Sequence, residues 1–315
     1  MKMRKTLWIM IIAIVFALGD VSKEHQAYGS RIAFVSFFEG VDTEICVINP
    51  DRTVLQNLTN NPKSSSIWPI WSPDGKKIAY VDFIPLPDRL YQMDADGKNV
   101  TLLKADYPDF QSRPAYSPDG KEIAFGGFFS ITILDIDTRE ERRLIVPKQD
   151  SLDAAWSPDG RQIAFAVRDI GDGWQWEIYV INTDGTQLRR LTKHPFNDRA
   201  PAWSPDGRKL AFFSVRNNVE GGIFLMDADG TNLEQITNAG EDFPSWSPDG
   251  RKLAFSVNLR RTRVGVMNAD GSKLKFLANG HRPSWQPDGS AYHVNPVERR
   301  VSIWGLIKQF LSRDN

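Results

Sequence analysis

The histidines and aspartates are the residues of this sequence best suited to catalysis or metal binding. The four histidines are His25, His194, His281 and His293, and no two have the spacing of a zinc site on a helix. The aspartates recur about once per repeat, whereas a calcium ion needs several oxygen ligands at one place. No Gly-x-Ser-x-Gly segment, which presents a serine nucleophile in hydrolases, occurs. We therefore predict no catalytic residue, no metal and no cofactor.

Two other groups of residues are candidates for binding. Trp174 and Trp176 lie in "DIGDGWQWE", where two indoles on a loop would stack on a sugar or on a partner's side chain. The second group stands three to five positions before a recurrent aromatic residue and carries both signs of charge, which suits a peptide or a polar ligand. Its members are Gln111, Arg113, Asp153, Asp198, Arg199, Glu241, Asp242, His281 and Arg282. Packed structural roles for these residues remain the alternative.

A repeat must position both groups. The segment "WSPDGKKIAY" returns four times with small changes, and a damaged copy, "WQPDGSAYHV", follows. The copies begin 39 to 47 residues apart, which is the length of one four-stranded propeller blade. The opening aromatic residues are predicted to pack between blades; they are Trp71, Tyr116, Trp156, Trp203, Trp246 and Trp285.

Each repeat divides into four strands, A to D. Ser-Pro-Asp-Gly is a turn, because proline presets its first central residue and glycine accepts a positive φ. A second turn, such as "MDADG", separates strands C and D. The B–C and D–A connections vary and share the opposite face, where binding sites usually lie. The nine polar residues precede strand A, so we expect them at the mouth of a central channel on that loop face.

The two ends of the repeat predict how the ring closes. The segment "GSRIAFVS" (29–36) aligns with a strand B, and "HRPSWQPDG" (281–289) supplies a strand A with nothing to follow it. Pairing residues 283–286 with residues 32–36 would remove the open edge. The fold class is therefore all-β: a six-bladed propeller whose C-terminal strand A joins N-terminal strands B, C and D. Residues 291–294 have no place in this scheme.

These repeats resemble the TolB-type propeller family, also called WD40-like or PD40, over residues 31–294. The resemblance implies a six-bladed fold and, for the best-known member, a periplasmic protein that binds an outer-membrane lipoprotein. That member has an α/β domain ahead of its propeller, whereas only about 30 residues precede the first strand here. The family builds many unrelated functions on one fold.

The ends of the chain lie outside the propeller, which we place at residues 30–294. Residues 1–29 read as a signal peptide and leader, with three cations before a short apolar run and cleavage after Gly19 or Gly29. An uncleaved anchor is the alternative. Residues 295–315 carry apolar groups at helical spacing, which predicts a short amphipathic helix that packs on the propeller or docks elsewhere.

The overall composition narrows the partners. Thirty-nine basic and 39 acidic residues balance, so no nucleic-acid partner is expected, and no membrane span is expected after signal cleavage. The single Cys46 reads as a buried thiol in a strand. We predict an exported, periplasmic or secreted, non-catalytic scaffold that binds a protein or peptide partner, or a small polar or sugar ligand. The alternative is a secreted carbohydrate-active propeller that binds or cleaves sugars.

Overall fold

A computed structural model describes residues 31–37, 43–61, 64–83, 87–106, 112–169, 175–216, 220–258 and 262–288. Over these ranges the chain forms strands and turns and no helix, and none of its described elements is a helix able to cross a membrane. The expected leader at 1–29, the segment 291–294 and the expected tail helix at 295–315 lie outside the described residues.

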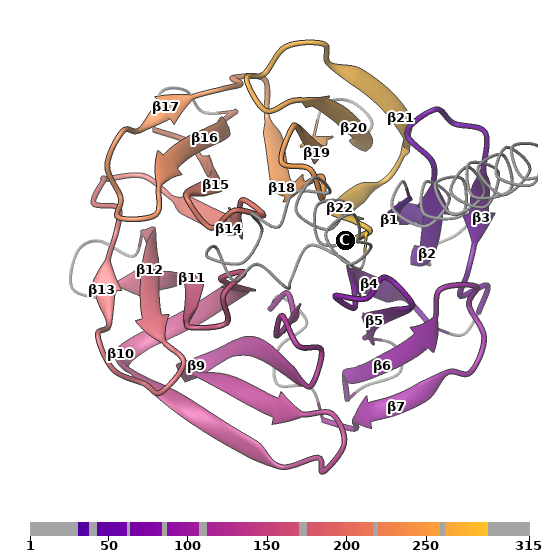
Figure 1. Cartoon of the computed structure of the whole chain (residues 1–315), viewed down its shortest axis with the longest axis horizontal. Helices are drawn as coiled ribbons and strands as arrows, with labels where there is room; N and C mark the ends of the chain where they lie inside the picture. The colour runs from indigo at the N-terminus through magenta and orange to yellow at the C-terminus, as the bar shows by residue number, and fades with distance from the viewer. Residues whose placement is uncertain are drawn as a thin grey trace, which may run out of the picture.

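The described strands form five antiparallel sheets arranged around a common centre (Figure 1). Four sheets have four strands each, listed here from the centre outwards. One contains β22 (His281–Trp285), β1 (Ile32–Phe37), β2 (Thr43–Ile48) and β3 (Leu55–Asn57). The next contains β4 (Ser66–Trp71), β5 (Lys77–Asp82), β6 (Arg89–Asp94) and β7 (Thr101–Lys104). A third contains β14 (Asp198–Trp203), β15 (Lys209–Ser214), β16 (Gly222–Asp227) and β17 (Glu234–Gln235). The fourth contains β18 (Glu241–Trp246), β19 (Lys252–Asn258), β20 (Thr262–Asn268) and β21 (Lys275–Asn279).

The fifth sheet differs from the expected four-stranded unit. Its six strands are β8 (Ala115–Tyr116), β9 (Glu122–Asp135), β10 (Glu141–Trp156), β11 (Gln162–Asp169), β12 (Trp176–Asn182) and β13 (Arg189–Arg190). The start of β9 pairs with β8 and its end pairs with the start of β10. The end of β10 pairs with β11 after a break in register between Ile145 and Asp150. The two long strands β9 and β10 thus connect, in one sheet, two units that are separate in the sequence repeat.

The Ser-Pro-Asp-Gly turns have the predicted geometry. In the first, the backbone N–H of Gly75 donates to the Ser72 carbonyl at 2.9 Å, and Gly75 has a φ of 68°. The Ser72 hydroxyl donates to Asp74 Oδ1 at 2.6 Å, and that oxygen also accepts the N–H of Lys76 at 3.1 Å. The same bonds recur at the other described turns. The repeated aspartates therefore serve the turns themselves.

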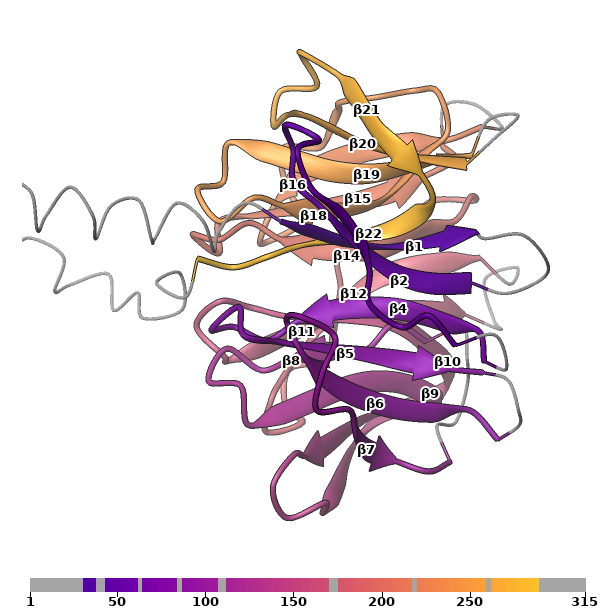
Figure 2. The same cartoon turned by 90° about the vertical axis from the view of Figure 1, so that its right-hand side faces the viewer.

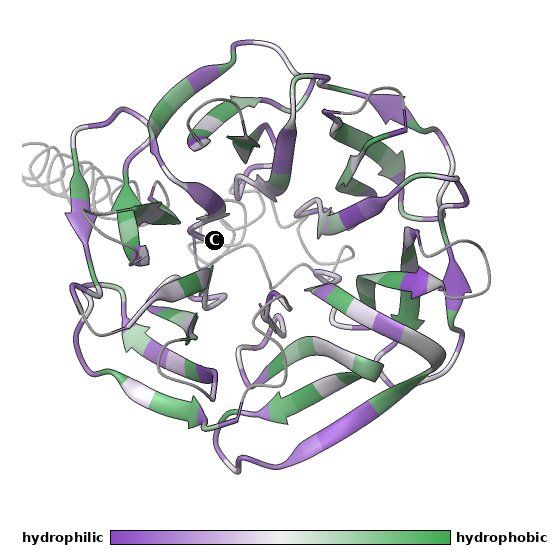
Figure 3. Ribbon diagram, turned by 180° about the vertical axis from the view of Figure 1, so that it is seen from behind, coloured by the Kyte–Doolittle hydropathy of each residue, from purple (hydrophilic) through white to green (hydrophobic). Residues whose placement is uncertain are grey.

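The hydrophobic core lies between the sheets and within their inner strands. The second strand of each repeat contributes a buried aromatic ring at the same position: Phe34, Tyr80, Phe125, Phe165, Phe212 and Phe255. Figure 3 shows the hydrophobic residues mostly on the inner and middle strands and hydrophilic stretches along the outer rim. This pattern is expected for sheets that bury both faces and expose an edge.

The first and last strands of the described chain pair with each other. In the register between β1 and β22, Ile32 faces Trp285 and Ala33 faces Ser284. The backbone N–H of Gln286 continues this contact by donating to the Arg31 carbonyl at 2.9 Å. The seam pairing predicted from the two partial repeats is therefore present.

Two faces follow from the strand directions, as the side view in Figure 2 shows. We call the side that carries the Ser-Pro-Asp-Gly turns (72–75, 117–120, 157–160, 204–207 and 247–250) the turn face. The opposite side, with connections such as 195–197 and 239–240, is the loop face.

Candidate functional site

Five of the inner strands share an unusual backbone near their loop-face end. The third residue before the aromatic residue has a φ between 51° and 56°, and the strand register shifts at or next to this point. Left-handed φ values are rare for bulky residues, and bulges of this kind re-aim neighbouring side chains. The five residues are Trp68, Asp153, Ala200, Phe243 and Arg282. Arg113 holds the same sequence position but does not have a positive φ.

The predicted mouth residues include a cluster of charges that come from five different repeats. Its members are Arg113, Asp153, Arg199, Asp242 and Arg282. Burial raises the pKa of Asp153, against the pull of Arg199, Arg113 and Arg282. Burial also raises the pKa of Asp242 to about 6, again opposed by Arg199, and lowers that of Arg282 to about 10. Desolvation thus outweighs the attraction between these charges. Fully ionised, the cluster has three cations and two anions.

Aromatic rings pack beside this cluster. The Trp68 and Phe243 rings meet edge to face at 5.2 Å between centroids. The Arg282 guanidinium carbon lies 3.8 Å from the centroid of the Trp68 ring and 5.8 Å from that of Phe243. Trp68 is 3% exposed. Aromatic rings as well as the expected polar residues therefore lie at this end of the inner strands.

The other predicted mouth residues have partners within the fold. Asp198 is fully buried and pairs with Arg216, with Asp198 Oδ2 and Arg216 Nη2 2.5 Å apart. The buried Glu241 accepts the backbone N–H of Ala239 at 2.8 Å. His281 stacks on Phe37 at 5.1 Å, and burial lowers its pKa to about 3. These contacts give Asp198, Glu241 and His281 structural roles.

Only one of the two candidate tryptophans is described. The backbone N–H of Trp176 donates to Asn197 Oδ1 at 3.0 Å, and the Arg168 guanidinium carbon lies 5.4 Å from the Trp176 ring centroid. Trp176 is half-buried. Trp174 and Gln111 lie outside the described residues, so the stacking role of the tryptophan pair stays a prediction.

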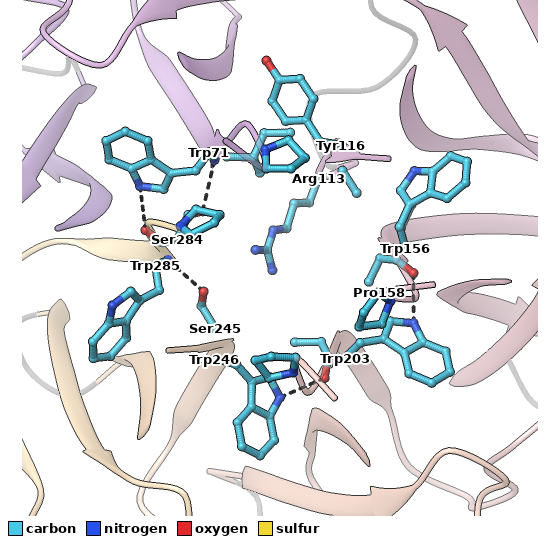
Figure 4. Close-up of a pocket in the computed structure, with 18 of the residues that line it drawn as sticks. Trp71, Arg113, Tyr116, Trp156, Pro158, Trp203, Ser245, Trp246, Ser284 and Trp285 are labelled. Atoms are coloured by element: carbon cyan, nitrogen blue, oxygen red, sulfur yellow. Dashed lines mark hydrogen bonds between the residues drawn. The ribbon is translucent and has the colours of Figure 1, made fainter. Parts of the chain in front are cut away.

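A cavity of about 160 Å³ lies at the opposite end of the channel, toward the turn face. Its walls come from every repeat and consist mainly of the opening aromatics, the small residues just before them, and the turn prolines. They include Ala155, Ala202, Ser245, Ser284 and Pro248, and also Arg113. Figure 4 shows Arg113 reaching toward the middle of this ring. Of the predicted mouth residues, Arg113 is the one that lines the cavity.

Hydrogen bonds between neighbouring repeats hold the cavity walls in place. The Trp71 indole donates to the Ser284 carbonyl, Trp203 to Ala155 and Trp246 to Ala202, each at 3.1 Å. These bonds are drawn in Figure 4. These three indoles therefore bridge neighbouring repeats. All six opening aromatics also line a cavity that was not predicted from the sequence. The sequence does contain an indication of this cavity, because a small residue, Ala or Ser, directly precedes five of the six aromatics.

The described residues offer no grouping of three or more His, Cys, Asp or Glu side chains fit to hold a metal. The cavity is instead a mixed surface of aromatic rings, proline and alanine, with two serine hydroxyls and one guanidinium. Such a surface can bind an apolar group with a polar or charged end. The site is therefore suited to recognition.

The comparisons with known proteins agree with this architecture. No curated protein matches the chain in sequence. Among solved structures, TolB from Acinetobacter baumannii has a TM-score of 0.73 at 23% identity, over 82% of this chain and 67% of that chain. A chain of a nidogen/laminin complex has a TM-score of 0.64 at 12% identity, over 81% and 98%.

An oligogalacturonate lyase in complex with manganese is more distant, with a TM-score of 0.54 at 16% identity over 79% of this chain and 73% of that one. At these identities the similarity concerns the fold alone. The sequence match to a family model is the stronger finding, because the model for the TolB beta propeller domain, PD40, covers residues 87–300. With its repeated turns, its sheets around one centre and this match, the chain belongs to the PD40 family of TolB beta propeller domains.

Proposed function

We propose that this protein is an exported, non-catalytic propeller that binds a protein or peptide partner in the cell envelope, through the cavity on its turn face. The observation that carries this proposal is the cavity itself, which is framed by residues from every repeat. Tryptophan and tyrosine are enriched where proteins bind one another most tightly. A rigid ring of such residues presents a pocket that needs little ordering when a partner binds.

The size of the cavity favours a protein partner. Pockets for small molecules typically span about 300–1,000 Å³, whereas this one measures about 160 Å³. That volume suits one side chain of a partner rather than a whole oligosaccharide. The partner's remaining contacts would then lie on the prolines and turns around the rim.

The proposal includes a closed ring of six blades. Two features support it: the pairing of β22 with β1, and the division of the six-stranded sheet into two sets of pairings. The packing of the turns agrees, since a Cβ on Gly120 would lie 3.6 Å from Pro73, and one on Gly75 would lie 2.8 Å from the Pro287 carbonyl. Each turn thus rests on the one before it, and the first described turn rests on the last.

Export rests on the leader at residues 1–29, which lies outside the described residues. Mass spectrometry of protein expressed in its own host should find a mature N-terminus at Asp20 or Ser30. A full-length chain that retains Met1 and fractionates with membranes would support the uncleaved anchor instead.

The binding proposal is tested by a pull-down from envelope extract with two matched variants. Ala202 is half-buried in the cavity wall, so Ala202→Leu should fill part of the cavity and release the partner. Trp176→Ala removes an aromatic ring near the loop face and should leave binding intact. Before the pull-down, both variants should be shown to have the melting temperature of the wild type, so that a loss of binding does not reflect a loss of folding. Loss of the partner with Trp176→Ala alone would place the site on the loop face.

Carbohydrate cleavage is the alternative function, supported by the fold shared with oligogalacturonate lyase. Purified protein should show no turnover of oligogalacturonate with added manganese. Measurable cleavage would replace the scaffold proposal by an enzymatic one.

A further inference from the structure

The turn-face cavity contains one charged side chain. Among the described residues that line it, Arg113 alone is charged. No hydrogen bond or ion pair joins its guanidinium to another described residue, although Asp153 interacts with it electrostatically. A guanidinium carries five donors in a fixed fork that matches a carboxylate. An arginine that lines a cavity without such a partner is suited to receive one from outside.

The charges around Arg113 do not balance. Among its basic neighbours Asp153 interacts most strongly with Arg199, then with Arg113 and then with Arg282. Arg199 and Arg282 also act on Asp242. Both aspartates thus have cationic partners other than Arg113. The cluster has one more cation than anions, and burial lowers the pKa of Arg113. An anion that entered the cavity would relieve this cost.

The backbone at Arg113 differs from that of its equivalents. The other five residues at this sequence position have a positive φ, and Arg113 does not. Its inner strand, β8, is described over only Ala115–Tyr116. Trp68 and Arg282 at the equivalent positions contact each other beside the loop-face cluster, whereas Arg113 reaches into the turn-face cavity (Figure 4).

Two hydroxyls on the cavity wall complete the polar lining. The Ser245 hydroxyl oxygen accepts the backbone N–H of Trp285 at 2.9 Å, and the Ser284 hydroxyl oxygen accepts that of Trp71 at 3.4 Å. Each oxygen accepts a bond, so its own hydrogen can be donated to a ligand. In Figure 4 both serines stand across the cavity from the strand that carries Arg113.

We infer that the cavity binds a carboxylate presented by the partner's chain, and that Arg113 is the residue that recognises it. This inference rests on the proposed function, because it names the chemistry of the group that enters the proposed site. The carboxylate comes from an acidic side chain or from a free C-terminus; both fit the same fork of donors, and the remaining atoms of the inserted residue contact the indoles and prolines.

Three pools of pentapeptides serve as probes. The first has glutamate at its centre and both ends blocked, and the second has glutamine there and both ends blocked. The third has central glutamine and a free C-terminus. Immobilised protein is incubated with equal mixtures, and mass spectrometry measures the retained ratios. The wild type should retain the first or third pool over the second by roughly 30-fold or more, as expected for a desolvated charge pair.

Two variants separate Arg113 from general charge effects. Arg113→Gln should reduce the ratio to about one, and Arg113→Lys should restore part of it. Arg161→Gln removes a cation from the exposed part of a turn on the same face and should leave the ratio unchanged. The inference would be overturned if Arg161→Gln lowered the retention ratio as much as Arg113→Gln, or if Arg113→Gln did not lower it.

A measurement on the wild type covers the case in which Arg113→Gln does not fold. Sodium acetate, added at the ionic strength of a sodium chloride control, should shift the Arg113 Nε–H resonance in a saturable way. An unmoved resonance would overturn the inference. Equal retention of all pools would overturn it too, while the Ala202→Leu pull-down would still judge the proposed function independently.

Discussion

Deleting β22 should unfold the propeller, because that strand joins the two ends of the described chain. The perturbation removes residues 281–315. A matched deletion of residues 289–315 keeps β22 and removes only residues beyond the described part of the chain. The difference between the two truncated proteins therefore isolates the contribution of residues 281–288.

The magnitude follows from what β22 and Gln286 contribute. Trp285 is 8% exposed, and truncating such a ring typically costs about 3–5 kcal/mol. The hydrogen bonds lost include three well-aligned ones: Trp71 Nε1 to the Ser284 carbonyl, the N–H of Gln286 to the Arg31 carbonyl, and Gln286 Nε2 to the Gly75 carbonyl. Each contributes about 0.5–1.5 kcal/mol. The total of about 5–9 kcal/mol approaches the whole stability of an ordinary domain, about 5–15 kcal/mol.

Urea unfolding followed by circular dichroism measures the effect. The chain without residues 289–315 should unfold cooperatively, whereas the chain without residues 281–315 should be unfolded or nearly so in buffer. The reasoning about closure would be refuted if both truncations had the same midpoint and slope.

Three further perturbations test other parts of the structure. Burial raises the folded-state pKa of Asp242 to about 6, so the carboxyl stabilises the fold most when protonated and loses this contribution as the pH rises through 6. The free energy of unfolding of Asp242→Asn, measured with urea relative to that of the wild type, should therefore rise by up to about 3 kcal/mol from pH 4 to pH 7. The same difference between variant and wild type at both pH values would contradict the burial of a charged carboxylate. Trp203→Phe loses the indole bond to the Ala155 carbonyl and should cost about 1 kcal/mol more than Trp156→Phe, whose buried Nε1 has no described partner. Equal thermal stabilities of the two variants would argue against the indole bonds. Burial, with a smaller contribution from Glu44, raises the pKa of Cys46 to about 12, so iodoacetamide at pH 8 should label it only after unfolding, as mass spectrometry would detect.

The repeat was predictable because its chemistry is local. The Ser-Pro-Asp-Gly turn is closed by bonds among its own residues, such as Ser72 to Asp74, so four letters suffice to specify it. The seam was predictable for a related reason, since an unpaired strand B at one end and an unpaired strand A at the other match only each other. Both predictions needed no knowledge of how side chains from different repeats meet.

The site was harder to predict because it depends on contacts between side chains from different repeats. A left-handed φ occurs at Trp68, Asp153 and Ala200 alike, and these residue types share no preference for it. Sequence position alone therefore could not tell that the Trp68 and Phe243 rings contact each other near the loop face. Nor could it tell that Arg113, which lacks the positive φ, lines the cavity at the other end.

Photo-crosslinking in living cells tests most directly which face binds the partner. Benzoylphenylalanine is placed at Pro248, a turn proline on the cavity wall, or at Phe196, which is 49% exposed on the loop face. The account predicts a crosslinked partner from position 248 and none from position 196. A partner captured from position 196 alone would contradict the turn-face site.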